Sequence, residues 1–332
     1  MVFAYPWVLL ALAVPVLLIV FNRAEKAARV LDALRRVEPR RLYVAADGPR
    51  RHVPGDVERC ERTRRLLDDV GWPCEVHTLY QDRNLGCKVG PETAISWFFE
   101  QVEAGIILED DCVPVPDFFP FCAELLDRYA HVAEVMMVGG HNRLGTWDSG
   151  GVSYVFSRTS PIWGWATWRR AWDAYDGSIT AWADPEIRAR IRSIMSRAEF
   201  QATARRLDSV RRGQLEAWDF GWALALMRSG GLSAVATRNL VANIGFDEEA
   251  THTKNRLAHT ATLPTYPLDL PLNHPNDVRS SAEFDRALFR YRFPLSRRIV
   301  TALPHPVQAP LRTGLQQATA ILARAKAGGR AR

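Results

Sequence analysis

The chain has few cysteines, and their positions do not suit a disulfide framework or a structural zinc site. Its 332 residues include five cysteines, at positions 60, 74, 87, 112 and 122. The number is odd, and no two of them have CxxC spacing. We therefore expect reduced thiols in a cytoplasmic protein.

Two common phosphate-binding signatures are also missing. Neither GxGxxG nor GxxxxGK[ST] occurs at any expected strand–helix turn. Their absence disfavours a dinucleotide-cofactor enzyme and a P-loop enzyme. The sequence has no internal repeat, which leaves one large α/β domain or two modest domains for a chain of this length.

The main body lacks the positive charge of a nucleic-acid-binding protein. Net charge is +6, but ten of the 43 Lys and Arg lie between Arg286 and Arg332 with no acid among them. Residues 1–285 therefore carry a net charge of −4, and we expect no nucleic-acid partner. The basic excess belongs to a tail, 276–332. That tail is either a basic amphipathic segment in peripheral contact with a membrane or a solvated C-terminus.

The first 21 residues contain no charge and are long enough to cross a bilayer. No basic segment precedes them, and Pro15 interrupts the run. We favour dividing the run into an apolar leader, 1–14, and a first buried strand, 16–21. A membrane anchor is the alternative.

Strands and helices alternate along the next part of the chain. This alternation predicts an α/β fold with a parallel, doubly wound sheet and ligands at the carboxyl ends of its strands. Strands are expected at 16–21, 41–46, 75–79, 135–138, 233–236 and 240–242, besides one that ends in the acid triplet described next. Helices are expected at 24–37, 57–70, 91–103, 117–129 and 216–228, with two more within 185–212.

The apolar residues 106–108 are followed by three adjacent acids, Glu109, Asp110 and Asp111. Three carboxylates inside a core would repel one another and lose hydration, so we expect them at the open end of a strand. Their oxygens suit Mg²⁺ or Mn²⁺, which complete their coordination with water and substrate phosphates. A solvated acidic turn is the alternative interpretation.

The sequence also resembles a known enzyme family. The run NLGCKVGPETAISWFFEQVEAGIILEDDCVPVPDFF, with WGWATW, AWDFGW and NIGFDEEATHT later on, is similar to GT-A nucleotide-sugar glycosyltransferases. The most similar branch contains the β-1,2-N-acetylglucosaminyltransferases and their bacterial relatives. The likeness covers residues 15–256, and its most specific part is the acid triplet followed by Pro-Asp-Phe-Phe.

The resemblance implies a GT-A fold over residues 15–275, a Rossmann-like α/β domain with a mostly parallel central sheet flanked by helices. It also implies a metal-dependent, inverting transfer of sugar from a nucleoside-diphosphate sugar, UDP-linked, to a hydroxyl. The acceptor would be a surface glycan or its lipid-linked precursor, assembled at the cytoplasmic face of the membrane. Two rival functions stay open, a sugar nucleotidyltransferase and a non-catalytic glycan-binding protein.

For the acid triplet, the resemblance implies that Asp111 binds Mn²⁺ or Mg²⁺. Glu109 and Asp110 would then face the ribose and sugar of the donor. This chain has Glu-Asp-Asp where most GT-A enzymes have Asp-x-Asp.

Polar residues that follow other strands are further candidates for donor binding. The resemblance places Asn22, Arg23 and Asp47 at the nucleotide, where the Asp47 carboxylate would accept the uracil N–H. A plain turn is the other interpretation of Asp47. Arg83 and Lys88 are candidates for neutralising diphosphate charge, or are lone surface cations.

Asp219, between Trp218 and Phe220, is the candidate catalytic base. The resemblance places the family's inverting base at this Trp-Asp step, and aromatic neighbours would desolvate the carboxylate. The alternative is an acid in the first turn of a helix, stabilised by the helix dipole. Both roles are compatible.

Aromatic residues and one histidine complete the candidates. Trp163 and Trp165 would stack on the acceptor sugar, although tryptophans at this spacing are more often core residues. His252 is a candidate second ligand for the metal or the phosphates, within a loop, 245–255, that would close over the donor.

Overall fold

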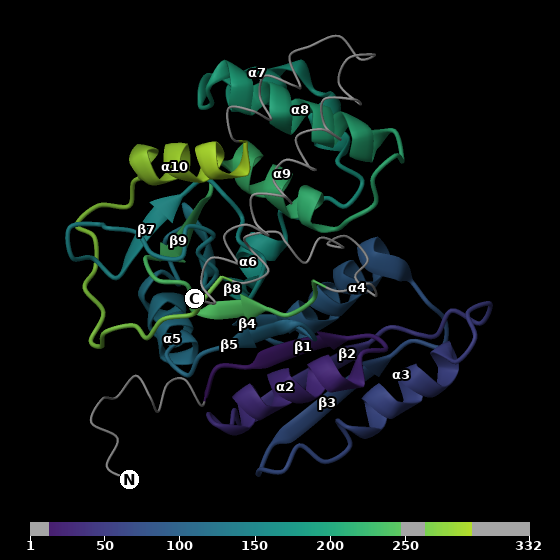
Figure 1. Cartoon of the computed structure of the whole chain (residues 1–332). Helices are drawn as coiled ribbons and strands as arrows, with labels where there is room; N and C mark the ends of the chain where they lie inside the picture. Colours follow the sequence, from purple (N-terminus) through teal and green to yellow (C-terminus); the bar gives the residue numbers. More distant parts are fainter. Residues whose placement is uncertain (1–12, 247–262, 294–332) are drawn as a thin grey trace, which may run out of the picture.

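The computed structural model describes residues 13–246 and 263–293, which form an eight-stranded sheet covered by helices on both faces (Figure 1). The strand order is β3-β2-β1-β4-β8-β6-β9-β7. The strands are β1 (Val16–Val20), β2 (Arg41–Ala46), β3 (Glu75–Tyr80), β4 (Ala104–Glu109), β6 (Val135–Gly139), β7 (Tyr154–Ser157), β8 (Trp165–Trp168) and β9 (Leu232–Ala236). A second, two-stranded sheet pairs β5 (Cys112–Pro114) with β10 (Val241–Asn243).

The described helices include one at each predicted position, although the one predicted to begin at 91 begins at 86, and two more, 169–172 and 282–292, that were not predicted. They are α2 (Ala24–Arg35), α3 (Asp56–Arg65), α4 (Gly86–Gln101), α5 (Phe118–Arg128), α6 (Arg169–Trp172), α7 (Pro185–Ser193), α8 (Arg197–Arg211), α9 (Asp219–Ser229) and α10 (Ala282–Arg292), with a short 3-10 helix η1 (Thr180–Ala183). The predicted pair of helices within 185–212 is confirmed as α7 and α8.

One half of the large sheet is parallel, as predicted. β1 pairs with β2 on one side and β4 on the other, and β2 pairs with β3. Each of these strands except β3 is a nearly continuous buried apolar run, which is typical of a parallel strand covered on both faces. The chain is therefore an α/β protein with a large, mostly parallel sheet flanked by helices.

Two antiparallel strands were not predicted. β8 lies between β4 and β6 and runs antiparallel to both, while β7 runs antiparallel to β9 at the edge of the sheet. β7 and β8 are buried along their whole length, so they show no alternation of apolar and polar residues. In addition, Trp165 of β8 was interpreted as an acceptor-binding residue, so the strand was missed.

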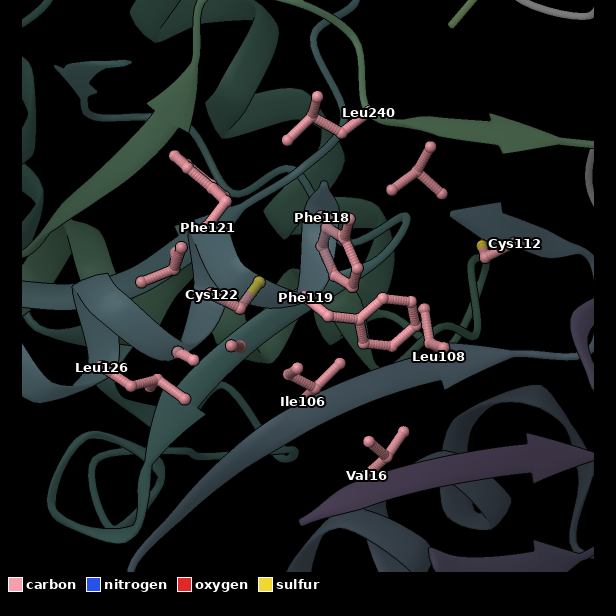
Figure 2. Packing of buried hydrophobic residues seen from close by; sticks show 14 of the residues in the cluster. Val16, Ile106, Leu108, Cys112, Phe118, Phe119, Phe121, Cys122, Leu126 and Leu240 are labelled. Carbon is pink, nitrogen blue, oxygen red and sulfur yellow. The ribbon is translucent and has the colours of Figure 1, made fainter. Parts of the chain in front are cut away.

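Two apolar layers hold the sheet between its helices. On one face, Val16 and Leu108 pack with the helices α2 and α5, and Figure 2 shows Phe118 and Phe119 of α5 beside Leu108. On the other face, Leu17 of the same strand packs with α4 and α9. The alternation of side chains along β1 thus supplies both layers.

Two further sets of helices pack beside this core. α7, α8 and η1 pack on α9 through a separate cluster that includes Trp182 and Leu207, and they lie at the opposite end of the molecule from α2 and α3 (Figure 1). α10 packs its Phe284 and Leu288 against β7 and β9. Part of the segment 276–332, which was assigned to a basic tail, is therefore folded onto the sheet.

Residues 1–12 of the predicted leader and residues 294–332 of the predicted tail lie outside the described residues. Within the part of the chain that the structure describes, no helix is both long and apolar enough to cross a membrane.

Candidate active site

A cavity of about 1060 Å³ lies at the carboxyl ends of the central strands. The strand order places the ends of β2, β1 and β4 side by side, because β1 is paired with both of its neighbours. Asp47 follows β2, Asn22 and Arg23 follow β1, and the acid triplet begins at the last residue of β4. All of these residues line the cavity. The predicted gathering of polar strand ends is thus confirmed.

The acid triplet shares one arginine, Arg23. Its guanidinium donates two hydrogen bonds to Asp110, through Nη2 and, at 3.2 Å, through Nε. Nη1 lies 3.0 Å from Oδ2 of Asp111. Arg23 therefore binds two carboxylates of the triplet directly and holds them in place, while its contact with the donor stays a prediction.

The triplet fits a divalent cation by charge and by ligand type. One guanidinium balances one of its three acids, and burial together with the charges of Asp111 and Asp110 raises the pKa of Glu109. A cation would relieve this excess of negative charge. In residues 13–246 and 263–293, no three His, Cys, Asp or Glu side chains are grouped to hold a metal by themselves. The carboxylate oxygens of the triplet are the ligand type that Mg²⁺ and Mn²⁺ prefer.

Asp111 also contacts the last residue of β10 and the two residues that follow it. Asn243 Nδ2 lies 3.4 Å from Asp111 Oδ1, and the N–H of Ile244 donates to the carbonyl of Asp111 at 2.8 Å. Gly245 packs so closely on the carboxylate that an added Cβ would collide with Oδ2. The position of the Asp111 side chain therefore depends on a glycine 134 residues later in the sequence.

Asp47 does not have the role predicted for it. Its carboxylate accepts hydrogen bonds from the N–H groups of Gly48 and Leu85 at 2.8 Å, of Gly86 at 3.1 Å, and from Asn84 Nδ2 at 2.8 Å. A carboxylate has about four lone-pair sites, and these four donors fill them. No acceptor site is left for a uracil N–H, and Asp47 instead ties the end of β2 to the start of α4.

Asn22 and Arg50 are organised by a buried acid that the sequence did not reveal. Asp56, the first residue of α3, is fully buried. It accepts from Asn22 Nδ2 at 2.5 Å, from Arg50 Nε at 2.9 Å and from Arg59 Nη2 at 2.8 Å. The hydrogen bond and charge of Arg50 hold the pKa of Asp56 well below its usual range, against the effect of burial. The Asn22 amide is therefore oriented by Asp56, and Arg50 is a cavity-lining cation that sequence reasoning missed.

Arg83 and Lys88 are not placed at the cavity wall. Arg83 is exposed, Lys88 is half-buried, and neither belongs to the residues that line the cavity. The backbone of Arg83 packs against Gly48, where a Cβ would collide with it. The prediction that these two cations face a diphosphate is therefore not supported, whereas Arg50 does line the cavity.

Asp219 lies in the same cavity as the acid triplet. It is half-buried and is the first residue of α9, so its carboxylate also faces the positive end of the helix dipole. Its charge acts on Glu109, which places the two carboxyl groups within electrostatic reach of each other. The geometry is compatible with both predicted roles, base and first-turn acid.

The two candidate tryptophans, Trp163 and Trp165, differ in burial and in their position relative to the cavity. Trp165 is 0% exposed and stacks on Trp218 at 5.7 Å between ring centroids, so it is a core residue, and the acceptor-binding prediction for it is wrong. Trp163 is half-buried, lines the cavity, and makes an edge contact with Phe246 at 5.7 Å. Residues two apart on a strand point to the same side of a sheet, but Gly164, just before β8, has a positive φ that turns the backbone between these two tryptophans.

His141 and Arg143, in the loop after β6, also line the cavity and were not predicted as site residues. His141 is 2% exposed, and its Nδ1 lies 3.0 Å from Asn239 Oδ1. Because that partner is an acceptor, Nδ1 carries the proton of the neutral ring. Burial lowers the pKa of His141 to about 3, and the charge of Arg143 adds to the effect. The strand-end position after residues 135–138 was the available sequence signal for both residues.

His252, the predicted late ligand, and most of the predicted closing loop lie outside the described residues. No protein-family model matches the chain, and no curated protein matches it. The functional argument therefore depends on the cavity and its side chains.

Proposed function

We propose that this protein is a metal-dependent, inverting glycosyltransferase of the GT-A type. It would transfer a sugar from a nucleoside-diphosphate sugar, UDP-linked, to a hydroxyl of a surface glycan or a lipid-linked acceptor. The observation that carries this proposal is that one cavity is lined by the acid triplet at one place and by Asp219 at another. A cation-binding group and a base would thus face the same bound substrates.

The size of the cavity supports a reaction between two substrates. At about 1060 Å³, it is at the upper end of pockets for single small ligands, which measure roughly 300–1,000 Å³. Arg50, held by Asp56, offers positive charge beside the ends of β1 and β2. A nucleoside diphosphate would therefore lie along those strand ends, with its phosphates near Asp111.

The proposed reaction uses Asp219 to remove a proton. The acceptor oxygen forms a bond to the anomeric carbon while the bond from that carbon to the diphosphate oxygen breaks. The hydroxyl proton passes to the Asp219 carboxylate, and the diphosphate leaves with the electron pair of the broken bond. Bound Mn²⁺ or Mg²⁺ would supply positive charge to the leaving diphosphate, with Asp111 as its protein ligand.

The test compares two variants with the parent protein. Binding of UDP in the presence of Mn²⁺ is measured by thermal shift, because a ligand that binds only the folded state raises the unfolding temperature. Release of UDP from a panel of UDP-sugars measures turnover. We expect Asp111→Asn to abolish Mn²⁺-dependent binding, and Asp219→Asn to keep binding but lose turnover. Glu186→Gln, an exposed acid of α7, is the matched control.

Three outcomes would contradict the proposal. Near-normal turnover in Asp219→Asn would remove the base assignment. UDP binding without any release of UDP from the sugar panel would favour a non-catalytic glycan-binding protein. Formation of a nucleotide sugar and pyrophosphate from UTP and a sugar phosphate would identify a nucleotidyltransferase.

A further inference from the structure

Arg143 differs from the neighbouring cations of the cavity, because no acid among the described residues forms an ion pair with it. Arg23 is paired with Asp110 and Asp111, and Arg50 is paired with Asp56. By contrast, across residues 13–246 and 263–293 no carboxylate forms an ion pair with the Arg143 guanidinium, which lies over the ring of Trp163 at 4.8 Å.

Partial burial of an arginine costs solvation free energy unless an anion or hydrogen-bond acceptor binds its guanidinium. Arg143 is half-buried, and burial lowers the pKa of its guanidinium, although an arginine stays protonated in proteins. The cation has five N–H donors in a planar fork, which match the oxygens of a carboxylate or a phosphate. Stacking on Trp163 satisfies the face of the guanidinium and leaves its edge to donate hydrogen bonds.

The backbone around Arg143 is fixed. The preceding residue, Asn142, is fully buried and donates from Nδ2 to the carbonyls of Ala236 and Thr237, at 3.0 and 3.1 Å. Asn142 Oδ1 accepts the N–H of Leu144 at 3.0 Å. Both neighbours of Arg143 are thus held by one amide, so the guanidinium is presented from a preorganised loop.

Arg143 follows β6, which β8 separates from β4 and the acid triplet. The charge of Asp219, another residue that lines the cavity, acts on Arg143. Arg23, in contrast, is acted on by Asp110, Asp111 and Glu109. An anion bound at Arg143 would therefore belong to the substrate beside Asp219, which is the acceptor in the proposed function.

We propose that Arg143 and Trp163 form an acceptor subsite that binds an oxyanion next to a sugar ring. The guanidinium fork would bind the anion, and the exposed part of the Trp163 ring would pack on the C–H face of the sugar. The acceptor class is therefore an acidic sugar, whose charge comes from a uronic-acid carboxylate or from a phosphate. This inference rests on the proposed function, since it assigns the acceptor for the same site.

The experiment measures binding of three sugars by ligand-observed NMR at constant ionic strength. The probes are methyl β-glucuronide, glucose 6-phosphate and neutral methyl β-glucoside, each added with and without UDP and Mn²⁺. We expect the parent protein to bind one or both anionic probes about 10–100-fold more tightly than the neutral one, as for a charge-assisted pair. Comparison of the carboxylate probe with the phosphate probe identifies the source of the charge.

Three variants connect this preference with Arg143. Arg143→Gln is expected to remove the preference for the anionic probes, and Arg143→Lys to keep part of it, because a lysine retains the charge without the fork. Arg205→Gln, which removes an exposed arginine of α8 outside the cavity, should change nothing. Thermal unfolding of each variant shows that it is folded.

Two results would overturn the inference. One is equal binding of anionic and neutral probes by the parent protein, or an unchanged preference for the anionic probes in Arg143→Gln. The other is loss of UDP–Mn²⁺ binding in Arg143→Gln, which would assign Arg143 to the donor diphosphate. Failure of the proposed function looks different, because the parent protein would then not bind UDP and Mn²⁺ while its preference for anionic sugars would still be measurable without nucleotide.

Discussion

The buried histidine beside the cavity makes a quantitative prediction about acid stability. His141 is 2% exposed, and its pKa is lowered from 6.5 to about 3 by burial, with a contribution from Arg143. In the unfolded chain the ring regains its ordinary pKa, so below about pH 6.5 the unfolded state binds more protons than the folded state. The stability provided by the neutral ring is therefore complete above pH 6.5 and is lost as the pH falls toward 3.

The magnitude follows from the two pKa values. At pH 5 the folded ring is still neutral, while the unfolded ring is almost fully protonated. One unit of pKa corresponds to about 1.4 kcal/mol, so the free energy of unfolding should fall by about 2 kcal/mol between pH 7 and pH 5 because of this residue alone. The hydrogen bond to Asn239 and the contact with Trp163, at 4.6 Å between ring centroids, depend on the same neutral ring.

The assay is urea unfolding of the parent protein and of His141→Gln at pH 7 and pH 5. The variant should be less stable at pH 7, since it loses the fitted ring. The difference between the two proteins should then shrink by about 2 kcal/mol at pH 5, because glutamine does not titrate. His131→Gln, which removes an exposed histidine, is the control. A difference of equal size at both pH values would refute the reasoning.

Three further changes have defined outcomes. Asp56→Asn should cost about 1–3 kcal/mol of unfolding free energy, measured by urea unfolding, because the buried side chain loses the charge-assisted hydrogen bonds from the partly exposed Arg50; a loss below about 0.5 kcal/mol would contradict this account. Gly245→Ala should lower the unfolding free energy by about 1–3 kcal/mol, because the added methyl group collides with the Asp111 carboxylate. It should also weaken UDP–Mn²⁺ binding in calorimetry, and unchanged affinity would show that the Asp111 position is not critical. Asp285→Asn should lower the unfolding free energy by about 3 kcal/mol, since the buried carboxylate of this α10 residue loses its ion pair with Arg158, and unchanged unfolding in calorimetric scans would show that this pair does not stabilise the protein.

Local sequence patterns were sufficient to predict the strands that end at the cavity. β1 and β2 are continuous apolar runs followed by polar residues, and both the strands and the polar ends lie where the sequence placed them. The acid triplet was predicted in the same way, because three adjacent carboxylates after an apolar strand would lose too much hydration inside the core. Arrangement of the strand ends at one edge then follows from parallel pairing.

Contacts between distant residues explain most of the differences. The helix α4 was expected to begin at Pro91 but begins at Gly86, since Asp47 accepts the N–H groups of Leu85 and Gly86 across 38 and 39 residues. A cap supplied from so far away leaves no local signal. Likewise, nothing near Asp56 in the sequence marks it as buried, because its partner Asn22 comes from the end of another strand.

The location of β8 has a consequence for how this molecule can change. β8 joins β4 to β6, and it therefore divides the sheet into a first half that carries the acid triplet and a second half that carries Arg143 and α9. Under the proposed function, the first half binds the activated sugar and the second half selects the molecule that receives it. Substitutions around Arg143 and Trp163 can then alter the recipient while the nucleotide-binding half keeps its packing, so specificity for the two substrates can evolve separately.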